Sequence, residues 1–491
     1  MNSRRRVGHQ TVKLISSEKI QLRFSLALKP PEDLVRLVAS TPNLITKKAK
    51  TVHFENTYFD TPDRLLRHNQ LELLIQKKMV SVNKIQWLQV LQSSNSSATV
   101  LHRTNQLSTL LSDGQLNFGF LHIAEMGLFN RKKSKRLEQL QPYLKTSFER
   151  TSWSVKAACG SQVSVALECG ELIGNMQTAP IRELVLELLQ GNPTSLFDVA
   201  HEIAQSVPML LVHASVAERS TQIIEGKILE PVRPKPTSIT RQMTVKEVIG
   251  SILREPFVQF TSHLDMLRSS QNPELVHQAR IGWRRFKSAL RLFKKSPCLR
   301  DTPSRVGFRP LLKHLTLLRD LDVSTGYVEL LQGRVTANSR LRSVQIWKKV
   351  QQGLRRKRKY QRSQVLAAFL NPSVGVAIID IYRWLEFGIV KKTNKVHNKI
   401  KLNKATPQVT EAIRKLADQL LTQPINCTDP EIEHRTRILA KQLRYNVEAL
   451  APLLPAKKAK IWHKAATRVQ VEIGASRDIF RTIEIIAHLG I

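Results

Sequence analysis

The chain has few cysteines, and they are not arranged to cross-link or to hold zinc. Its four cysteines, Cys159, Cys169, Cys298 and Cys427, lie far apart and form no Cys-x-x-Cys pair. This spacing argues against a disulfide framework and a zinc ribbon, and it is typical of reduced thiols in a cytoplasmic protein.

Long apolar runs are also missing. No window approaches the roughly 20 apolar residues that a membrane-spanning helix needs, and the basic start MNSRRRVGHQ has no apolar run behind it. We therefore expect neither a transmembrane helix nor a signal peptide. The predicted location is the cytoplasm.

Acidic residues are scarce relative to basic ones. The 39 Asp and Glu face 77 Lys and Arg, which gives a formal net charge of +38. Because such a surplus repels itself and costs stability, it predicts a polyanionic partner. Nucleic acid, inorganic polyphosphate and an anionic membrane surface are the three candidates.

A proline-rich stretch divides the chain. Leu229–Thr240, LEPVRPKPTSIT, carries three prolines, which cannot continue a helix or a central strand. The net charge is +10 for residues 1–240 and +28 for residues 241–491. We predict a basic segment at 1–17, a first domain at 18–228, a linker at 229–244 and a second domain at 245–491.

The two halves differ in hydrophobic period. Alternating runs at 20–28, 85–92, 163–170 and 183–189 are typical of strands in an antiparallel sheet or barrel, and one helix is expected at 195–207. Beyond the linker, long glycine-poor segments have a helical period. The predicted fold is an all-β or α+β domain followed by an all-α domain.

Two segments of the second half share a basic pattern. The first stripe is His277, Arg280, Arg284 and Lys287, and the second stripe is His434, Arg437, Lys441 and Arg444, with the same offsets. At about 100° per residue, each set falls within an arc of roughly 80° on one helix face. Arg319-Asp320 and Arg477-Asp478 then follow at matching distances, which predicts two helical repeats.

An ordinary solvated helix face is the alternative reading of each stripe. Such a face usually carries both acidic and basic side chains, whereas the first stripe has no acidic partner. In the second stripe, Glu448 follows Arg444 by four residues and could pair with it. His277 and His434 could instead be ordinary histidines that cap a helix or pack against neighbouring side chains. A metal site is not expected, because no carboxylate or second histidine lies four residues away. Because His277 and His434 occupy matching positions in the two repeats, we favour the interpretation that they donate hydrogen bonds to a bound anion.

The same motifs resemble a known family. VHQARIGWRRFKSALRLF, LLRDLDV (Leu317–Val323) and HRTRILAKQLRY together resemble the CHAD domain, the conserved-histidine α-helical family, over about 245–491. The resemblance implies two four-helix bundles related by pseudo-twofold symmetry, whose basic faces line a groove that binds inorganic polyphosphate without a cofactor. The implied contacts are His277, Arg280, Arg284, Lys287, Arg319, His434, Arg437, Lys441 and Arg444.

A further basic run, GLRRKRKYQR at 353–362, does not fit one stripe because its cations surround every helix face. We expect an exposed connecting helix or loop that adds non-specific attraction. Nucleic-acid binding is possible, but no helix-turn-helix, zinc-finger or RNP pattern supports it.

The first half resembles the CYTH family, the triphosphate tunnel metalloenzymes, over about 18–225. The resemblance rests on the motifs at 56–73, 148–153 and 183–192. It implies an eight-stranded antiparallel barrel around a tunnel. In active members, glutamates hold a divalent metal such as Mg²⁺ or Mn²⁺, while Lys and Arg hold a triphosphate that is hydrolysed or cyclised.

Many of those positions have changed. Lys19, Gln21 and Arg23 stand where the family has Glu, Glu and Lys. Val185 replaces the middle acid between Glu183 and Glu187, and Glu168 stands for an aspartate. Leu74 and Gln76 fall where arginines are expected, and Ser215-Val216 replaces Ser-Lys before Glu218 and Arg219.

With so few carboxylates left, we predict a silent barrel with no catalytic residues. The chain is then an inorganic polyphosphate-binding protein of the cytoplasm, associated with polyphosphate granules. The alternatives are a Mg²⁺- or Mn²⁺-dependent triphosphatase or polyphosphatase and a non-specific nucleic-acid-binding protein.

Overall fold

The computed structural model describes residues 2–490 except 8–9, 28, 82–83, 94–99, 126–134, 175–176, 214–238, 336–340, 390–404 and 425–428. The chain divides into two compact units, Met1–Glu230 and Pro231–Ile491. Each is described by itself. Most of the predicted linker, together with Cys427, Ser215, Val216, Glu218 and Arg219, lies outside the described residues.

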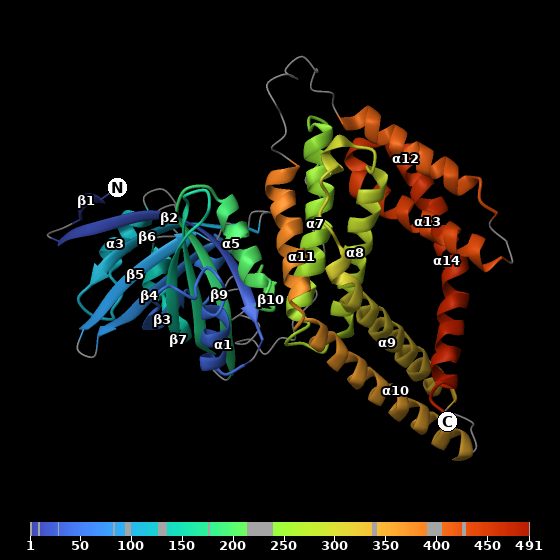
Figure 1. Cartoon of the computed structure of the whole chain (residues 1–491), viewed down its shortest axis with the longest axis horizontal. Helices are drawn as coiled ribbons and strands as arrows, with labels where there is room; N and C mark the ends of the chain where they lie inside the picture. Colours follow the sequence, from blue (N-terminus) through green and yellow to red (C-terminus); the bar gives the residue numbers. More distant parts are fainter. Residues whose placement is uncertain are drawn as a thin grey trace. The chain divides into compact units, whose positions relative to one another are not determined.

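The first unit is a closed antiparallel barrel (Figure 1). Its strands are β2 (Gln10–Leu26), β3 (Lys50–Asp60), β4 (Leu71–Ser81), β5 (Lys84–Ser93), β6 (His102–Leu111), β7 (Gln141–Lys156), β8 (Gln162–Ile173) and β9 (Thr178–Gln190). They follow the order β2-β6-β5-β4-β3-β7-β8-β9, and β2 closes the ring by pairing with β9 from Gln21↔Glu187 to Ser25↔Glu183. The predicted eight-stranded barrel is confirmed.

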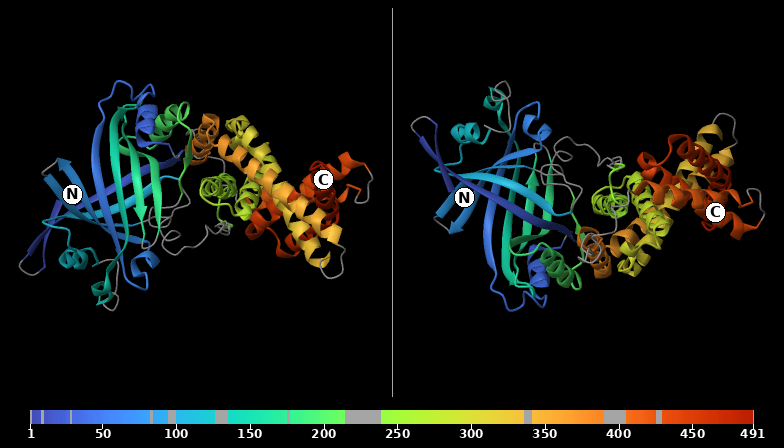
Figure 2. Two further views of the ribbon diagram at one scale, coloured as in Figure 1. Left: turned by 90° about the horizontal axis from the view of Figure 1, so that it is seen from below. Right: turned by 90° about the horizontal axis from the view of Figure 1, so that it is seen from above.

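Two shorter strands extend β2. β1 (Asn2–Val7) forms a hairpin with the first part of β2, and β10 (Met209–Leu211) pairs with its end. Residues 2–7 and 10–17, expected as a basic segment ahead of the domain, are therefore strand residues. Figure 2 shows how far this hairpin projects from the rest of the barrel.

Short helices cover the outside of the barrel. They are α1 (Pro31–Ala39), α2 (Leu65–His68), α3 (Phe118–Glu125) and α5 (Thr194–Ala204), with a 3₁₀ turn at Lys135–Gln139. The helix predicted at 195–207 is confirmed as α5, which buries Leu196, Phe197 and Ile203 and packs against β8 and β9. Burial of this apolar face holds the helix on the sheet.

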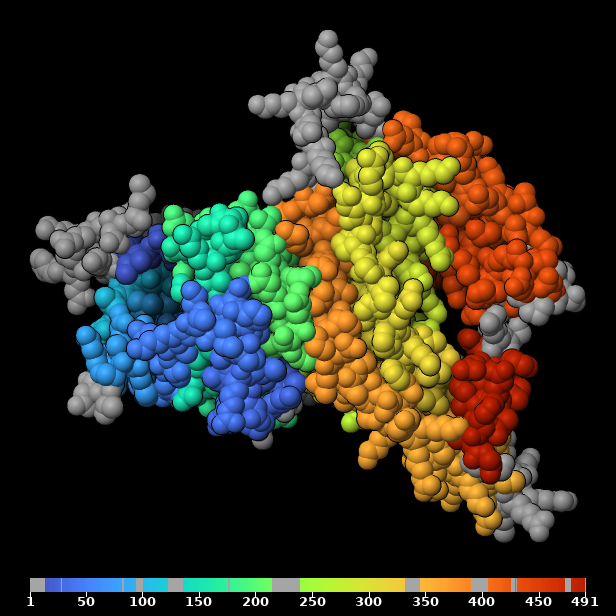
Figure 3. All heavy atoms as spheres, in the orientation of Figure 1, coloured from blue at the N-terminus to red at the C-terminus, as the bar shows by residue number. Residues whose placement is uncertain are grey.

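The second unit is helical. It contains α7 (Val245–Met266), α8 (Pro273–Leu292), α9 (Arg309–Val335), α10 (Leu341–Ala368), α11 (Pro372–Arg383), α12 (Ala405–Leu421), α13 (Pro430–Leu450) and α14 (Ala456–Ala487), with short helical segments at Pro297–Leu299, Val306–Phe308, Trp384–Gly388 and Ala451–Leu453. Figure 3 shows this unit, from α7 in green to α14 in red. No single described helix combines the length and hydropathy needed to cross a membrane; a bent pair, Gln345–Ala368 with Pro372–Gly388, does so only when taken together.

The helical unit is built from a repeat. α8 and α13 begin alike, because Asn272 and Asp429 each cap the helix by accepting from the second backbone N–H, and proline follows each cap. Each cap lies five residues before the histidine of its stripe. α9 and α14 meet at equivalent positions, where Ser324 Oγ donates to Thr482 Oγ1 at 3.2 Å. The helices α7–α8–α9 therefore correspond to α12–α13–α14.

Candidate functional site

Packing against α7 fixes which face of α8 remains for binding. Gly282 lies directly on α7, where a Cβ would come within 2.7 Å of Phe260 N and 2.8 Å of Pro256 O. Beside it, Trp283 lies 5.1 Å from Phe260 and Phe286 lies 5.0 Å from Phe257, measured between ring centroids. Because this face is buried, the first stripe is left on another side of α8, partly accessible to solvent.

The two stripes come together because α8 and α13 pack on each other. Asn446 of α13 donates to the carbonyl of Ser288 of α8 at 3.5 Å. Burial, and then the neighbouring charges of Arg284, Arg437 and Arg280, lower the pKa of Lys441 to about 7. A lysine from the second stripe thus lies in the field of two arginines from the first.

Arg319 of α9 and His277 complete this group. Burial, with Arg284 and Arg319 as neighbours, lowers the pKa of Arg280 to about 10. Burial first, and then the charge of Arg319, also lowers the pKa of His277. We call the following residues the basic cluster: His277, Arg280, Arg284, Arg319, Arg437 and Lys441.

The ends of the stripes behave differently. The pKa of Lys287 is lowered by burial and then by Arg291 and Arg305, so Lys287 extends the positive field toward the loop before α9. His434 is exposed in the second turn of α13. Arg444 pairs with Glu448 at 3.6 Å and its guanidinium stacks over Tyr445 at 5.1 Å.

Arg291 and Arg305 were not among the predicted contacts. Arg291 lies one turn beyond Lys287 on the same helix, so continuing the helical period would have found it. Arg305 stands in a loop, and no sequence period could have placed it beside α8.

Two aspartates border the basic cluster. Asp478 lies 3.9 Å from Arg437, and Asp320 accepts from Arg481 Nε at 3.3 Å. The side chain of Arg477 lies outside the described residues. Two acids do not balance five cations, so the basic cluster retains a positive charge that suits a ligand with several negative charges.

The basic run at 353–362 forms part of α10, and some of its cations have structural roles. Arg358 Nε donates to Asp322 at 2.5 Å, Arg362 donates to the carbonyls of Leu267 and Ser270 at 2.9 and 2.6 Å, and Lys357 reaches the carbonyl of His488. The expectation that the whole run is exposed was wrong for these residues, because they satisfy carbonyls and an acid of neighbouring segments. Arg355, Arg356 and Lys359 are exposed.

The barrel lumen contains the remaining family acids, but the chain's own donors bind them. Arg23 lies 3.2 Å from Glu183 and 3.6 Å from Glu168, measured between Nη1 and Oε2 atoms. Arg150 Nε donates to Glu168 at 2.9 Å, and Gln21 donates to Glu187 at 2.6 Å. The side chains of Glu183 and Glu168 are only 1% and 5% exposed.

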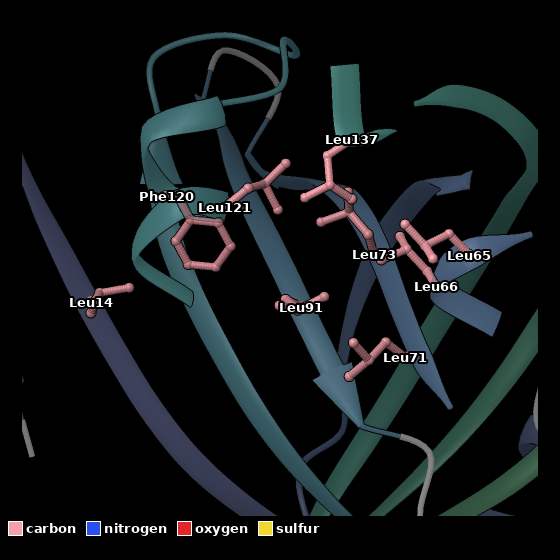
Figure 4. Close-up of a cluster of buried hydrophobic side chains, with 9 residues drawn as sticks. All are labelled: Leu14, Leu65, Leu66, Leu71, Leu73, Leu91, Phe120, Leu121 and Leu137. Carbon is pink, nitrogen blue, oxygen red and sulfur yellow. The ribbon is translucent and has the colours of Figure 1, made fainter. Parts of the chain in front are cut away.

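Much of the rest of the lumen is apolar. Leu74, at a position where the family has a cation, packs into one buried cluster with Phe54, Tyr58, Val90, Leu144, Phe148, Leu172 and Ile181. The rings of Phe54 and Phe148 stack at 5.7 Å, and Gln76 donates to Asn56 at 3.1 Å. Side chains of opposite parity, such as Leu73 and Leu91, form a separate cluster on the outside beneath α2 and α3 (Figure 4).

These residues do not fit a divalent metal. A hard cation needs several oxygen ligands, and each lumen glutamate already accepts from Arg or Gln. Across the described part of the chain, no group of three or more His, Cys, Asp or Glu could hold a metal ion.

The geometry defines a two-part protein, in which a barrel with an internally neutralised lumen precedes a helical repeat with a basic cluster. Residues 24–220 match the CYTH domain family, and residues 251–487 match the CHAD domain family. The chain therefore belongs to the proteins that carry a CYTH domain followed by a CHAD domain.

Among characterised proteins, the chain is similar to the inorganic triphosphatase of Haemophilus influenzae, with 23% identity over 205 residues. The match covers 42% of this chain, and the chain spans about half (54%) of that relative's length.

Solved structures give low overall similarity scores. The CHAD domain of the plant Ricinus communis has 22% identity and a TM-score of 0.42, covering 52% of this chain and 81% of that one. A putative adenylyl cyclase from Hippeastrum, described as having a dominant triphosphatase activity, has 16% identity and a TM-score of 0.27, covering 43% and 97%.

Proposed function

We propose that this protein binds inorganic polyphosphate through the basic cluster of its CHAD domain, with no cofactor required. The observation that carries the proposal is the convergence of Arg280 and Arg284 with Arg437 and Lys441 from the other repeat. Cations held this close repel one another in the folded protein, and a bound anion offsets that repulsion. Guanidinium groups also suit phosphate oxygens through charge-assisted hydrogen bonds.

Non-specific nucleic-acid binding is the competing function. It relies on charge spread over a wide surface, whereas the cations here come from three helices and share one field, with Lys287 continuing it toward Arg291 and Arg305. A linear chain of phosphates without bases or sugars matches a compact row of donors better than a duplex does.

Parallel titrations of the full chain test the proposal. Long-chain polyphosphate, duplex DNA and single-stranded RNA are titrated at one stated salt concentration and again at a higher one. We expect polyphosphate to bind most tightly and to keep more of its affinity at high salt. Equal affinities with equal salt slopes would favour the nucleic-acid function instead.

Binding should depend on pH through Lys441. Its pKa of about 7 in the free protein should rise beside a bound anion, so that binding takes up a proton above pH 7. Affinity should therefore fall as the pH rises through 7, by up to about tenfold per pH unit.

The matched control is Lys441→Arg, which keeps its charge throughout this range. Titration of the polyphosphate ends is common to both proteins and cancels in the comparison. Identical pH profiles for the two proteins would contradict a role for Lys441.

We further propose that the barrel is catalytically silent. The triphosphatase relative makes metal-dependent hydrolysis the alternative, but the lumen acids here are held by Arg23, Arg150 and Gln21. The full chain should release little or no phosphate from tripolyphosphate with Mg²⁺ or Mn²⁺. Turnover near one per second, an ordinary enzyme rate, would show that the barrel is active.

We also propose that the protein lies in the cytoplasm and collects on polyphosphate granules. The +28 charge of residues 241–491 supports this location, because a strongly basic domain follows its polyanion. A fluorescent fusion should concentrate on granules as they form, and a distribution that ignores them would count against polyphosphate as the partner.

A further inference from the structure

A second group of cations lies on α10 and shares no residue with the basic cluster. The helix carries nine Lys and Arg and no Asp or Glu. Three of the nine, Lys357, Arg358 and Arg362, bind groups of their own chain. Five others are exposed, and in the described part of the chain they have no ion pair or hydrogen bond. We call these five the α10 ridge: Lys348, Lys349, Arg355, Arg356 and Lys359.

Packing on α9 decides which side of α10 is exposed. Val350 and Leu354 are buried in a cluster with Leu321 and Val328 of α9. At about 100° per residue, the five cations fall within an arc of roughly 120° that is centred opposite these two buried positions. Figure 1 shows α10 at the edge of the helical unit. The charges are therefore presented outward on a helix that the core holds in place.

The α10 ridge consists of two rows with a neutral strip between them. The same angles place the rows about 100° apart around the helix. Gln345 and Gln352 lie between the rows, and both are exposed. Along the axis, the ridge extends about 17 Å from its first to its last cation. One row is Lys348, Arg355 and Lys359, and the other is Lys349 and Arg356.

We propose that the α10 ridge binds duplex DNA by entering the major groove. A helix with its side chains is about 10–12 Å across, and the major groove of B-form DNA is about 12 Å wide. Phosphates border this groove on both sides, so each row of cations meets one backbone. Gln345 and Gln352 then face the base edges, to which an amide donates and from which it accepts hydrogen bonds. The length of the ridge corresponds to about five base pairs.

Two other polyanions match this surface less well. A helix that binds an anionic membrane inserts large apolar side chains into the lipid interface, whereas glutamines lie between the rows here. A polyphosphate chain is a single thread, and a convex helix with two separate rows meets it along only one of them. A duplex groove is concave and has a backbone on each side, so its charge and its shape both complement the ridge.

Fluorescence anisotropy of the full chain with a labelled DNA duplex tests the ridge, at several salt concentrations. Arg355→Gln with Arg356→Gln removes one cation from each row and keeps good helix formers. Because two phosphate contacts are lost, we expect duplex affinity to fall about tenfold or more near 0.1 M salt, and the slope of log affinity against log salt to decrease by about 1.8.

The matched control is Lys457→Gln with Lys458→Gln. These neighbouring lysines are exposed near the start of α14, so the control removes the same number of charges with the same angular spacing. It should bind the duplex within about twofold of the wild type. A second ridge pair, Lys348→Gln with Lys349→Gln, should repeat the loss, and circular dichroism checks that each variant is folded.

Duplex RNA and vesicles that contain phosphatidylserine complete the test. The major groove of A-form RNA is deep and narrow and does not admit a helix, so duplex RNA should bind more weakly and respond less to the ridge variants. An equal loss for duplex RNA, or an equal loss of DNA affinity in the α14 control, would overturn groove binding. Vesicle binding that depends on Arg355 and Arg356, without any for DNA, would make the surface a membrane contact instead.

This inference does not depend on polyphosphate. A wild-type protein that binds polyphosphate but no duplex would remove the DNA surface and leave the proposed function intact. Duplex binding that is lost in both ridge pairs, by a protein that does not bind polyphosphate, would establish the surface and refute the proposed function.

Discussion

Replacing Arg280 and Arg437 together by alanine should weaken polyphosphate binding by about 2–5 kcal/mol, because each arginine loses a charge-assisted hydrogen bond of about 1.5–3 kcal/mol. The two residues come from α8 and α13, and both share the field of Lys441. Partly buried charges are poorly screened, so most of this loss should persist at high salt. Isothermal titration with polyphosphate of one length measures the change.

The matched control is Arg355→Ala with Arg356→Ala. Both arginines are exposed on α10, and the pair removes the same number of charges. Arg358 would be a poor control, since it holds Asp322 and its loss could disturb the fold. We expect the control to cost well under 2 kcal/mol and to fade as salt rises.

The comparison also decides between binding modes. A protein that binds through charge spread over its surface should lose the same affinity whichever two cations are removed. The dependence of its affinity on salt concentration should also weaken equally in both variants. Equal losses from the two double variants, with the fold intact, would refute the basic cluster as the site and favour nucleic-acid binding.

Local periodicity explains why much of the fold was predictable. The alternating runs at 85–92 and 183–189 lie within β5 and β9, and the basic stripes lie on α8 and α13 as their spacing indicates. Each pattern is set by residues within about three helical turns or a few strand positions of one another. Such short-range information is present in the sequence itself.

Long-range geometry explains what was missed. The roles of Arg358 and Arg362 depend on an acid of α9 and on carbonyls after α7, none of which is near them in sequence. Where helices cover the barrel, as over Leu73 and Leu91, alternation cannot tell the lumen from the outside because both faces are buried there. The apolar filling around Leu74 therefore had no sequence signal beyond the loss of the expected cation.

Removing Arg23 should destabilise the barrel by about 3–5 kcal/mol, the usual cost of taking one partner from a buried ion pair. Glu183 and Glu168, both nearly inaccessible to water, would lose their contacts with Arg23. Hydrogen exchange of the amides in β2, β8 and β9 measures the change within the full chain, since it reports the opening of the barrel itself.

Two further variants fix the interpretation of Arg23. Arg103→Ala removes an exposed pair with Glu18 on the same barrel and should cost at most about 1 kcal/mol. Adding Glu183→Gln to Arg23→Ala should recover part of the loss, because it removes the buried negative charge that Arg23 offsets. If Arg23→Ala is instead as stable as the wild type, Arg23 is a cation held for an anionic ligand, and the lumen is again a candidate site for triphosphate.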